Sequence, residues 1–475
     1  MKKLLIAFLV ILTSGSAFYF STGFHTIWWL MWIAPIPVLI YAYYESFIPV
    51  LLVAFIAGLA FGLNIILGYW STSIPSNAFI PAMFWQSTKW TITILLTRSL
   101  MRRNPSLLTI FAYPTIFALL EWLETFTIQG TFNTISYSQL PILPIIQIAS
   151  LTGYLGITFI LGLFSSSIAY AIIFRQDKIK ALTGILIGLV VVIFSLGYGY
   201  YRIHLFQQEK PLAQIKIGLI SVSREPQKII NPKFSNEIFS SYLPLMKNVV
   251  SNGAEVILLP EESFSVNTES APIYQQKLAS FAKQNKVKLI IGVRDFKKSG
   301  TYNSTWVYDE HGKWIGEYNK RHFVPVVENE LTPGIDLLTF DIKKNKSAIA
   351  ICRDMDYLKP AYDYGALGTQ ILFVPAWDYV ADAYVHATAA WMRGIENGYT
   401  LVRAARGGFL SVSIPTGEII AKAPAMSSQD SMLIAITPIY QNQSFFARHQ
   451  WWFVIFLWLC LAIIIGYSLL NKKNL

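Results

Sequence analysis

Cysteine is almost absent from this chain of 475 residues, which contains only Cys352 and Cys460. Cys460 lies in a long apolar run and Cys352 in a region of globular composition, so we expect no disulfide between them. Histidine is scarce too, with six residues scattered along the chain. No Cys or His pair has the spacing of a zinc site. These absences exclude a disulfide-rich scaffold and a zinc centre, and we expect neither a metal nor a cofactor.

Charge is the second feature in short supply. Charged residues make up 14% of the chain and hydrophobic residues 54%, a balance that is atypical of a soluble protein. The net charge is +11, but many basic residues flank apolar runs, where anionic lipid headgroups attract them. No aromatic and basic motif typical of nucleic-acid binding is present. The composition therefore predicts a membrane protein and excludes nucleic acid as a partner.

Long apolar runs are what the sequence has in abundance. A helix needs about 20 residues to cross a bilayer. Eight candidate spans lie at 4–22, 26–44, 48–70, 79–98, 107–125, 153–174, 181–201 and 450–470. We therefore expect a transmembrane domain of about seven spans over 1–203, a globular domain over 204–446, and a C-terminal transmembrane helix with a tail over 447–475.

The basic residues predict the orientation of these spans, because Lys and Arg in short loops are retained in the cytoplasm. With the N-terminus inside, the seventh span delivers the 204–446 domain to the extracytoplasmic face. The residues used are Lys2, Lys3, Arg98, Arg102, Arg103, Arg175, Lys178, Lys180, Lys472 and Lys473. The first span also has the features of a secretory signal peptide, and its cleavage would leave the later topology unchanged.

Short apolar runs rich in β-branched residues predict strands in the globular domain. They lie at 215–222, 256–260, 289–293, 304–309, 347–352, 371–376 and 400–405. Helical periodicity occupies 234–251, 272–286 and 381–397. Strands that alternate with helices indicate an α/β layered domain.

Three predicted strand exits carry residues suited to catalysis. Glu261 follows one strand, Lys320 and Glu328 flank a turn that contains proline, and Cys352 follows another strand. A carboxylate, an ammonium and a thiol are the components of a covalent acyl-transfer site. Taken singly, a cysteine in such a position is more often an inert core residue, and a glutamate and a lysine are more often solvated surface charges, so it is their combination that points to catalysis.

The order of these residues and their local sequences resemble a known superfamily. The segments LPEES (259–263), YNKRHFVPVVE (318–328) and ICRD (351–354) resemble the nitrilase superfamily, whose Glu-Lys-Cys triad lies on an αββα sandwich. Seven spans before such a domain and one after it resemble, within that superfamily, the apolipoprotein N-acyltransferase family. Further matching segments are EWLE (121–124), YSQ (137–139), AWD (376–378), MRGIENGYTLVRAARGG (392–408), PTGEI (415–419) and ARHQWW (447–452).

The resemblance implies a role for each matching residue. Glu261 would be the general base, Cys352 the nucleophile and Lys320 the oxyanion stabiliser. Glu328 would orient Lys320, and the backbone N–H of the residue after the nucleophile would be a second oxyanion donor. The supporting residues are therefore Glu328, Arg353, Asp354 and Trp377.

The chain also departs from the family pattern. Arg353 and Asp354 stand where Tyr and Glu are common, and Glu124 stands where an Arg is usual. Val374 and Pro375 replace a usual Asn-Asp pair, and the stretch between Pro325 and Cys352 is shorter than in the best-known members. These departures affect the expected fit to the lipid and the acceptor more than the reaction type.

The function implied is acyl transfer at the bacterial inner membrane, with the catalytic domain on the periplasmic side. The acyl donor would be a membrane phospholipid and the acceptor the N-terminal amine of a diacylated apolipoprotein, with a thioester on Cys352 between them. One alternative is a membrane-anchored amidase or hydrolase of the nitrilase type. The other is a receptor or scaffold without catalysis.

Several other polar residues attract attention without fitting the triad. Lys89 lies inside a predicted span, where a charge is costly, so function, pairing and snorkelling are all open. His322 and His386 are expected to be structural because Glu261 already supplies a base. Trp377 and Arg393 are weaker site candidates that packing or ion pairing would also explain.

Overall fold

The computed structural model describes residues 1–24, 27–70, 72, 74–426, 429–441 and 444–470. The chain forms two compact units, Met1–Leu205 with His449–Leu475, and Phe206–Arg448. Lys472 and Lys473, which the predicted topology uses, lie outside the described residues, as does residue 26 at the start of one expected span.

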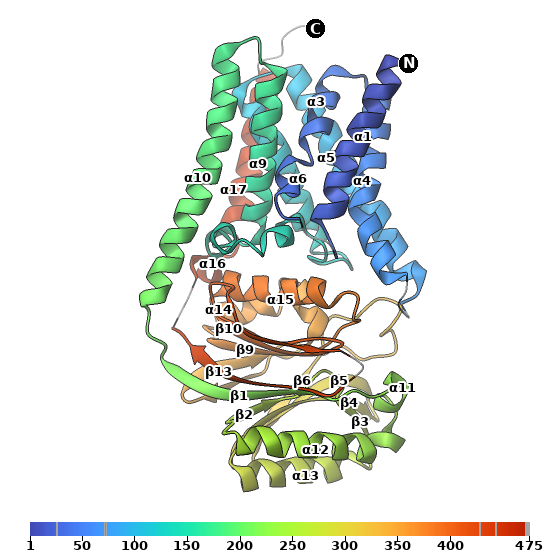
Figure 1. Ribbon diagram of the computed structural model, residues 1–475, viewed down its shortest axis with the longest axis vertical. Helices are drawn as coiled ribbons and strands as arrows, with labels where there is room; N and C mark the ends of the chain where they lie inside the picture. Colours follow the sequence, from blue (N-terminus) through green and yellow to red (C-terminus); the bar gives the residue numbers. More distant parts are fainter. Residues whose placement is uncertain (25–26, 71, 73, 427–428, 442–443, 471–475) are drawn as a thin grey trace. The chain divides into compact units, whose positions relative to one another are not determined.

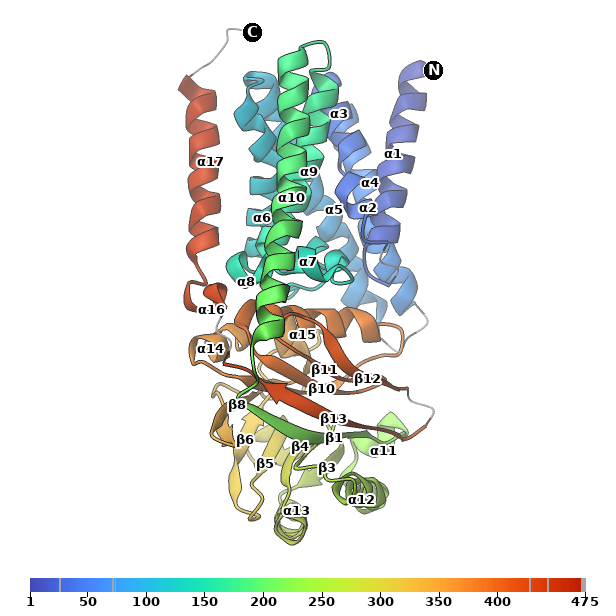
Figure 2. The same ribbon diagram turned by 60° about the vertical axis from the view of Figure 1, so that its left-hand side comes forward.

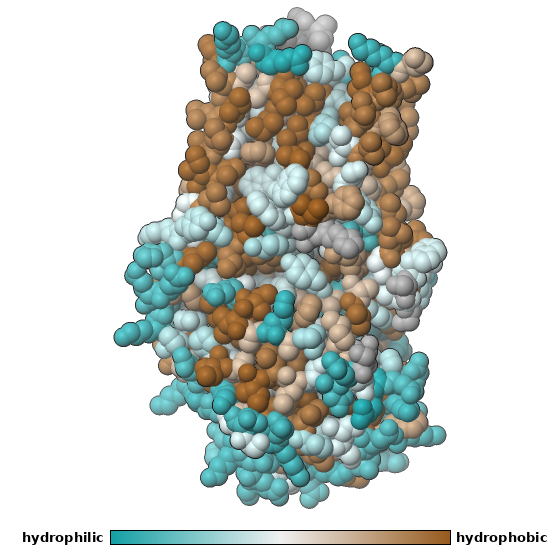
Figure 3. All heavy atoms as spheres, in the orientation of Figure 1, coloured by the Kyte–Doolittle hydropathy of each residue, from teal (hydrophilic) through white to brown (hydrophobic). Residues whose placement is uncertain are grey.

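The first unit is helical (Figure 1). Its elements are α1 (Lys2–Ser21), α2 (Leu30–Ile33), α3 (Ile36–Tyr44), α4 (Phe47–Tyr69), α5 (Ser76–Arg103), η1 (Leu107–Phe111), α6 (Ala112–Glu124), η2 (Ile135–Gln139), α7 (Leu143–Ile146), α8 (Ala149–Thr152), α9 (Tyr154–Ile173), α10 (Lys178–Gln208) and α17 (Trp452–Leu470). Figure 2 shows α10 and α17 as long single helices. Figure 3 shows apolar side chains over the exposed faces of α1 and α10, as lipid contact requires.

Six helical segments within the described residues are long and apolar enough to span a bilayer. They are Lys2–Ser21, Phe47–Tyr69, Leu107–Glu124, Tyr154–Ile173, Lys178–Gln208 and Trp452–Leu470. The expected span at 26–44 is instead divided into α2 and α3 around Pro35. The expected span at 79–98 falls in α5, which has 28 residues but also many polar side chains. The predicted polytopic helical membrane domain is confirmed.

The second unit contains two sheets that pack face to face. The first sheet has the order β13-β1-β2-β4-β5-β6, with β3 also paired to β4, and the second has the order β12-β11-β10-β9-β8-β7. The strands are β1 (Ala213–Ser221), β2 (Val256–Leu258), β3 (Phe264–Asn267), β4 (Lys288–Lys297), β5 (Gly300–Tyr308), β6 (Trp314–Asn319), β7 (Thr339–Ile342), β8 (Asn345–Ile349), β9 (Ile371–Trp377), β10 (Thr400–Arg406), β11 (Gly408–Ser413), β12 (Ile419–Ala425) and β13 (Ser431–Ile439).

Helices cover the outer face of each sheet (Figure 1). The helices α12 (Ser235–Ser251) and α13 (Ala271–Asn285) pack on the first sheet, and α15 (Ala383–Asn397) packs on the second. The other helices of this unit are α11 (Pro226–Ile229), η3 (Pro232–Phe234), η4 (Cys352–Asp356), α14 (Ala361–Ala366) and α16 (Phe445–Arg448). One apolar core, with Leu219 and Phe373, joins the inner faces of the two sheets, and a second, with Leu278, joins the first sheet to α12 and α13. This arrangement confirms the predicted αββα sandwich.

Parallel strands bring the expected catalytic segments to one edge of the sandwich. In the first sheet, β2 is parallel to β4, and two successive antiparallel pairings make β6 parallel to β4 as well. In the second sheet, β8, β9 and β10 are parallel. Carboxyl ends of parallel strands share an edge, so loops far apart in sequence meet there.

A buried ion pair explains the lysine in the middle of α5. Lys89 Nζ contacts Glu124 Oε2, and their side chains are 1% and 4% exposed. Glu124 Oε1 also accepts hydrogen bonds from Trp85 Nε1 at 2.9 Å and from Gln86 Nε2 at 3.0 Å. Of the three explanations left open for Lys89, pairing is therefore the one that the structure shows, and it joins α5 to α6.

We predict that Lys89→Met destabilises the helical unit, because it leaves the Glu124 carboxylate without its cation at a buried position. Breaking a buried pair from one side costs about 3–5 kcal/mol. Thermal unfolding in detergent should therefore occur at a lower temperature in Lys89→Met than in the wild type. The double variant Lys89→Met/Glu124→Gln should recover much of the loss, and a single variant as stable as the wild type would contradict this account.

Candidate active site

Three residues expected to act together follow strands that end at the same edge. Glu261 comes just after β2, Lys320 directly after β6, and Cys352 shortly after β8. Glu261 and Lys320 therefore come from the first sheet and Cys352 from the second.

The Lys320 ammonium lies between two carboxylates. Its Nζ is 2.7 Å from Glu261 Oε1 and 2.8 Å from each oxygen of Glu328. The side chains of Lys320 and Glu261 are only 1% and 3% exposed, so water screens this contact little. Because the ammonium donates to both acids, its position is fixed from two sides.

The two carboxylate oxygens of Glu261 differ in their hydrogen bonding. Its Oε1 accepts from Lys320 and from Asn303 Nδ2, the latter at 2.6 Å, whereas its buried Oε2 has no hydrogen-bond partner among the described residues. Asn303 Nδ2 is also 3.4 Å from Glu328 Oε1. The open Oε2 is therefore the atom able to accept a proton, while Oε1 holds the carboxylate in place.

Cys352 is the first residue of η4 and has a φ of 44°, in the left-handed region that is unfavourable for residues other than glycine. The predicted strand 347–352 is too long, because β8 ends at Ile349 and the chain turns sharply at the cysteine. The Cys352 thiol donates towards the Trp377 carbonyl oxygen at 3.7 Å. Backbone strain of this kind is often found at functional sites.

Burial, more than the neighbouring charges, favours the protonated form of the Cys352 thiol. Burial raises the pKa of the thiol well above its usual value, the Glu261 carboxylate adds to this, and Lys320 offsets part of it. Burial also raises the pKa of Glu261, and the Lys320 ammonium opposes that effect. Burial alone would lower the pKa of Lys320, but Glu261 and Glu328 outweigh it and raise that pKa well above normal. A thiol, a carboxylate with raised basicity and a permanent cation therefore meet.

Asp354 connects the turn at Cys352 to the segment that carries Lys320. One carboxylate oxygen accepts from the backbone N–H groups of Arg321 and His322 at 3.1 and 3.0 Å. The other accepts from Ile351 N at 3.1 Å and from the Tyr318 hydroxyl at 2.7 Å. Asp354 thus supports the site from outside the triad.

The other expected residues have varied surroundings. The guanidinium of Arg353 is 6.0 Å from the ring centroid of Tyr357. Trp377 ends β9, and its ring lies 4.6 Å from the guanidinium of Arg406. Arg393 is fully buried and pairs with Glu396 at 2.5 Å on the same helix, α15, so ion pairing accounts for it.

Both histidines are held by aspartates. His322 Nδ1 is 3.0 Å from Asp354 Oδ1, and its ring stacks on Tyr357 at 3.9 Å. His386 lies between Asp356 and Asp382, at 3.6 and 3.2 Å. These contacts agree with the structural role expected of both residues.

Sequence reasoning missed two groups near the triad. Asn303, which lies on β5, bridges Glu261 and Glu328. Arg403 of β10 forms a pair with Asp378 through two hydrogen bonds of 2.6 and 2.8 Å. The Asp378 carboxylate raises the pKa of the Cys352 thiol, and the Arg403 guanidinium lowers it. Their signal in the sequence was a polar residue inside an apolar strand, which alone does not reveal its partner.

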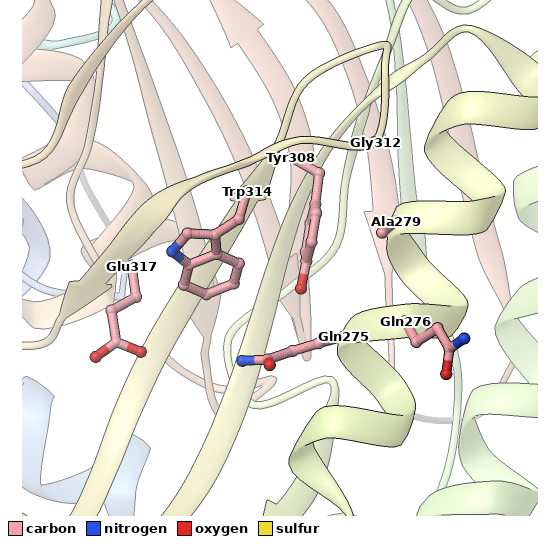
Figure 4. Close-up of a pocket in the computed structure, with 7 residues that line it drawn as sticks. All are labelled: Gln275, Gln276, Ala279, Tyr308, Gly312, Trp314 and Glu317. Carbon is pink, nitrogen blue, oxygen red and sulfur yellow. The ribbon is translucent and has the colours of Figure 1, made fainter.

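A cavity of about 610 Å³ lies elsewhere on the sandwich (Figure 4). It is lined by Gln275, Gln276, Ala279, Tyr308, Gly312, Trp314 and Glu317. Side chains alternate along a strand, so Glu317 faces this cavity while the neighbouring Tyr318 turns inward to Asp354. The cavity is therefore separate from the triad.

Two family models match the chain. Residues 14–167 match the apolipoprotein N-acyltransferase N-terminal domain, and residues 231–439 match carbon-nitrogen hydrolase. Together they reach into both structural units.

Two curated relatives are similar to this chain over most of their length. The apolipoprotein N-acyltransferase of Geobacter metallireducens is 25% identical over 403 residues, which cover 78% of this chain and 75% of the relative. That of Haemophilus ducreyi is 25% identical and covers 79% of each chain. A solved amidase from Nesterenkonia sp. is similar at a TM-score of 0.41 and 19% identity, over 47% of this chain and 90% of the amidase.

We predict that Asp354→Ala slows acylation of Cys352 by about 100-fold, because small displacements of catalytic groups carry costs of that order. Single-turnover labelling of Cys352 would measure this. Asp363→Ala is the matched control, since Asp363 forms only a partly exposed pair with Lys359 at 3.5 Å. Equal rates in Asp354→Ala and the wild type would refute the role of Asp354.

We also predict that Asn303→Leu moves the acid limb of the acylation rate to higher pH. The Asn303 hydrogen bond lowers the pKa of Glu261, so its loss raises that pKa, and Glu261 becomes protonated at a higher pH than in the wild type. A pH profile of single-turnover acylation tests the shift, with the surface variant Asn248→Leu as the control. A limb that stays in place, or moves to lower pH, would be evidence against this assignment.

Proposed function

Since this chain belongs to the apolipoprotein N-acyltransferase family, we propose that it transfers an acyl chain through Cys352, with Glu261 as the general base and Lys320 as the oxyanion stabiliser. The observation that supports this most strongly is the Lys320 ammonium, buried between Glu261 and Glu328 at 2.7–2.8 Å. The chain is a multi-pass membrane protein, and a lipoprotein is its acyl acceptor.

In the first half-reaction, Glu261 Oε2 takes the proton of the Cys352 thiol as Sγ attacks the ester carbonyl of the donor. Lys320 stabilises the negative charge that develops on the carbonyl oxygen. The C–O bond then breaks, and Glu261 returns the proton to the departing alkoxide. The products are a thioester on Cys352 and a deacylated alcohol.

In the second half-reaction, the free amine of the acceptor attacks the thioester carbonyl. Glu261 accepts a proton from the amine, the C–S bond breaks, and the Cys352 sulfur recovers the proton. Lys320 stabilises this tetrahedral intermediate too. A thioester suits the exchange because an amine cleaves it far more readily than it cleaves an ordinary ester.

We further propose a membrane phospholipid as the donor and a diacylglyceryl-cysteine at the lipoprotein N-terminus as the acceptor. Both are held in a bilayer, so an enzyme with its own spanning helices meets them by lateral diffusion. We also propose the bacterial inner membrane as the location, as the family resemblance implies. The basic residues of the short loops favour an orientation with the catalytic domain over 204–446 on the periplasmic side.

The test is to trap the acyl-enzyme. Purified protein in detergent, incubated with a defined phospholipid, should gain one acyl chain on the Cys352 peptide by mass spectrometry. Cys352→Ala should lose the adduct and Cys460→Ala should keep it, because Cys460 lies in α17. A diacylated lipopeptide should then discharge the adduct.

Other outcomes would change the assignment. An adduct that water discharges as fast as the lipopeptide does would favour an anchored hydrolase. Absence of any adduct with several phospholipids would remove Cys352 from the mechanism.

A further inference from the structure

A second set of charged residues lies beside the triad. Arg294 of β4 contacts two carboxylates, with its Nη1 3.2 Å from Glu262 Oε1 and its Nη2 2.6 Å from Glu330 Oε1. Nη1 is also 3.3 Å from Glu262 Oε2, so it donates hydrogen bonds to both oxygens of the buried Glu262 carboxylate. We call Glu262, Arg294 and Glu330 the arginine clamp.

Arg294 connects two glutamates in the same way as the neighbouring Asn303 does. Arg294 and Asn303 are direct partners in the antiparallel pairing of β4 with β5, so their side chains share one face of the sheet. Asn303 bridges Glu261 and Glu328, while Arg294 bridges Glu262 and Glu330. Two neighbouring side chains therefore join the same two loops.

The backbone at Glu262 needs such a restraint. Its φ is 46°, which is costly for a residue with a side chain, and it directly follows the proposed base. Burial raises the pKa of the Glu262 carboxyl to about 7, with the nearby Arg294 guanidinium opposing the shift. Arg406 Nη1 also donates to the Glu262 carbonyl oxygen at 3.4 Å. The turn after Glu261 is thus held at both its side chain and its main chain.

We propose that Arg294 is a positioning residue for acyl transfer, which sets the separation of the Glu261 and Glu328 loops and so keeps both carboxylates on Lys320. This inference rests on the proposed function, because it assigns Glu261 as the base. Arg294 acts through the backbone of the two loops and does not itself contact the triad.

The different exposures of Arg294 and Glu330 make the proposal testable without unfolding the protein. The Arg294 side chain is 10% exposed, whereas that of Glu330 is 59% exposed. Glu330→Gln therefore weakens one arm of the clamp at a solvated position, where substitutions disturb stability little. Arg294→Lys keeps the positive charge but lacks the planar guanidinium that donates to two carboxylates at once. Lys297→Met is the matched control, because Lys297 lies on the same strand and pairs with Glu317 at 2.5 Å.

The experiment measures two rates on the full chain in detergent. The first is alkylation of Cys352 by iodoacetamide, which needs no lipid, and the second is acyl transfer from phospholipid to a diacylated lipopeptide. Arg294→Met should lower the alkylation rate and the kcat of transfer about 10-fold each, with KM changed less than about 2-fold. Arg294→Lys and Glu330→Gln should lie between this variant and the wild type, and Lys297→Met should match the wild type.

The outcomes separate this inference from the proposed function. Alkylation and kcat that are unchanged in Arg294→Met, in a wild type that transfers acyl chains, would overturn the positioning role alone. If the alkylation rate and kcat fell in proportion to the melting temperature across all variants, Lys297→Met included, the positioning role would also be overturned. A wild type that transfers nothing, but whose Cys352 alkylation still depends on Arg294, would overturn the proposed function and keep the clamp.

Discussion

The burial of one ammonium between two carboxylates is the constraint on which the site depends. Removing Lys320 from water is costly, and the cost is offset only because Glu261 and Glu328 both contact it. Burial, together with the Glu261 carboxylate, also raises the pKa of the Cys352 thiol, so the protonated thiol is the favoured form in this pocket. The ammonium that the two carboxylates neutralise is thus the group that we propose as the oxyanion stabiliser.

The sandwich supplies this arrangement by joining ends of strands from two sheets. The first sheet carries Glu261 and Lys320, and the second carries Cys352, so their relative placement depends on the apolar core between the sheets. Asp354 ties the Cys352 turn to the segment after β6, and Asn303 ties the loops after β2 and β6. Each hydrogen-bonded link restrains a group that a loop alone would leave mobile.

The sequence predicted the elements whose signals are local. Continuous apolar runs marked β2, β9 and β10, which are buried on both faces, and helical periodicity marked α12. Strands such as β12 were missed because exposed and half-buried residues alternate in it, with a proline near its end. The ordered acid, ammonium and thiol were found from motifs, whereas Arg294 was not, since only the pairing of β4 with β5 places it beside Asn303.

The most direct test of the shared ammonium is a double-mutant cycle between Lys320 and Glu328, read by single-turnover acylation of Cys352. If Glu328 acts only by holding Lys320, then Glu328→Gln slows the wild type but adds almost nothing in a Lys320→Met background. Effects that multiply in the double variant would mean that the two side chains act independently, and would contradict a site organised around one buried ammonium.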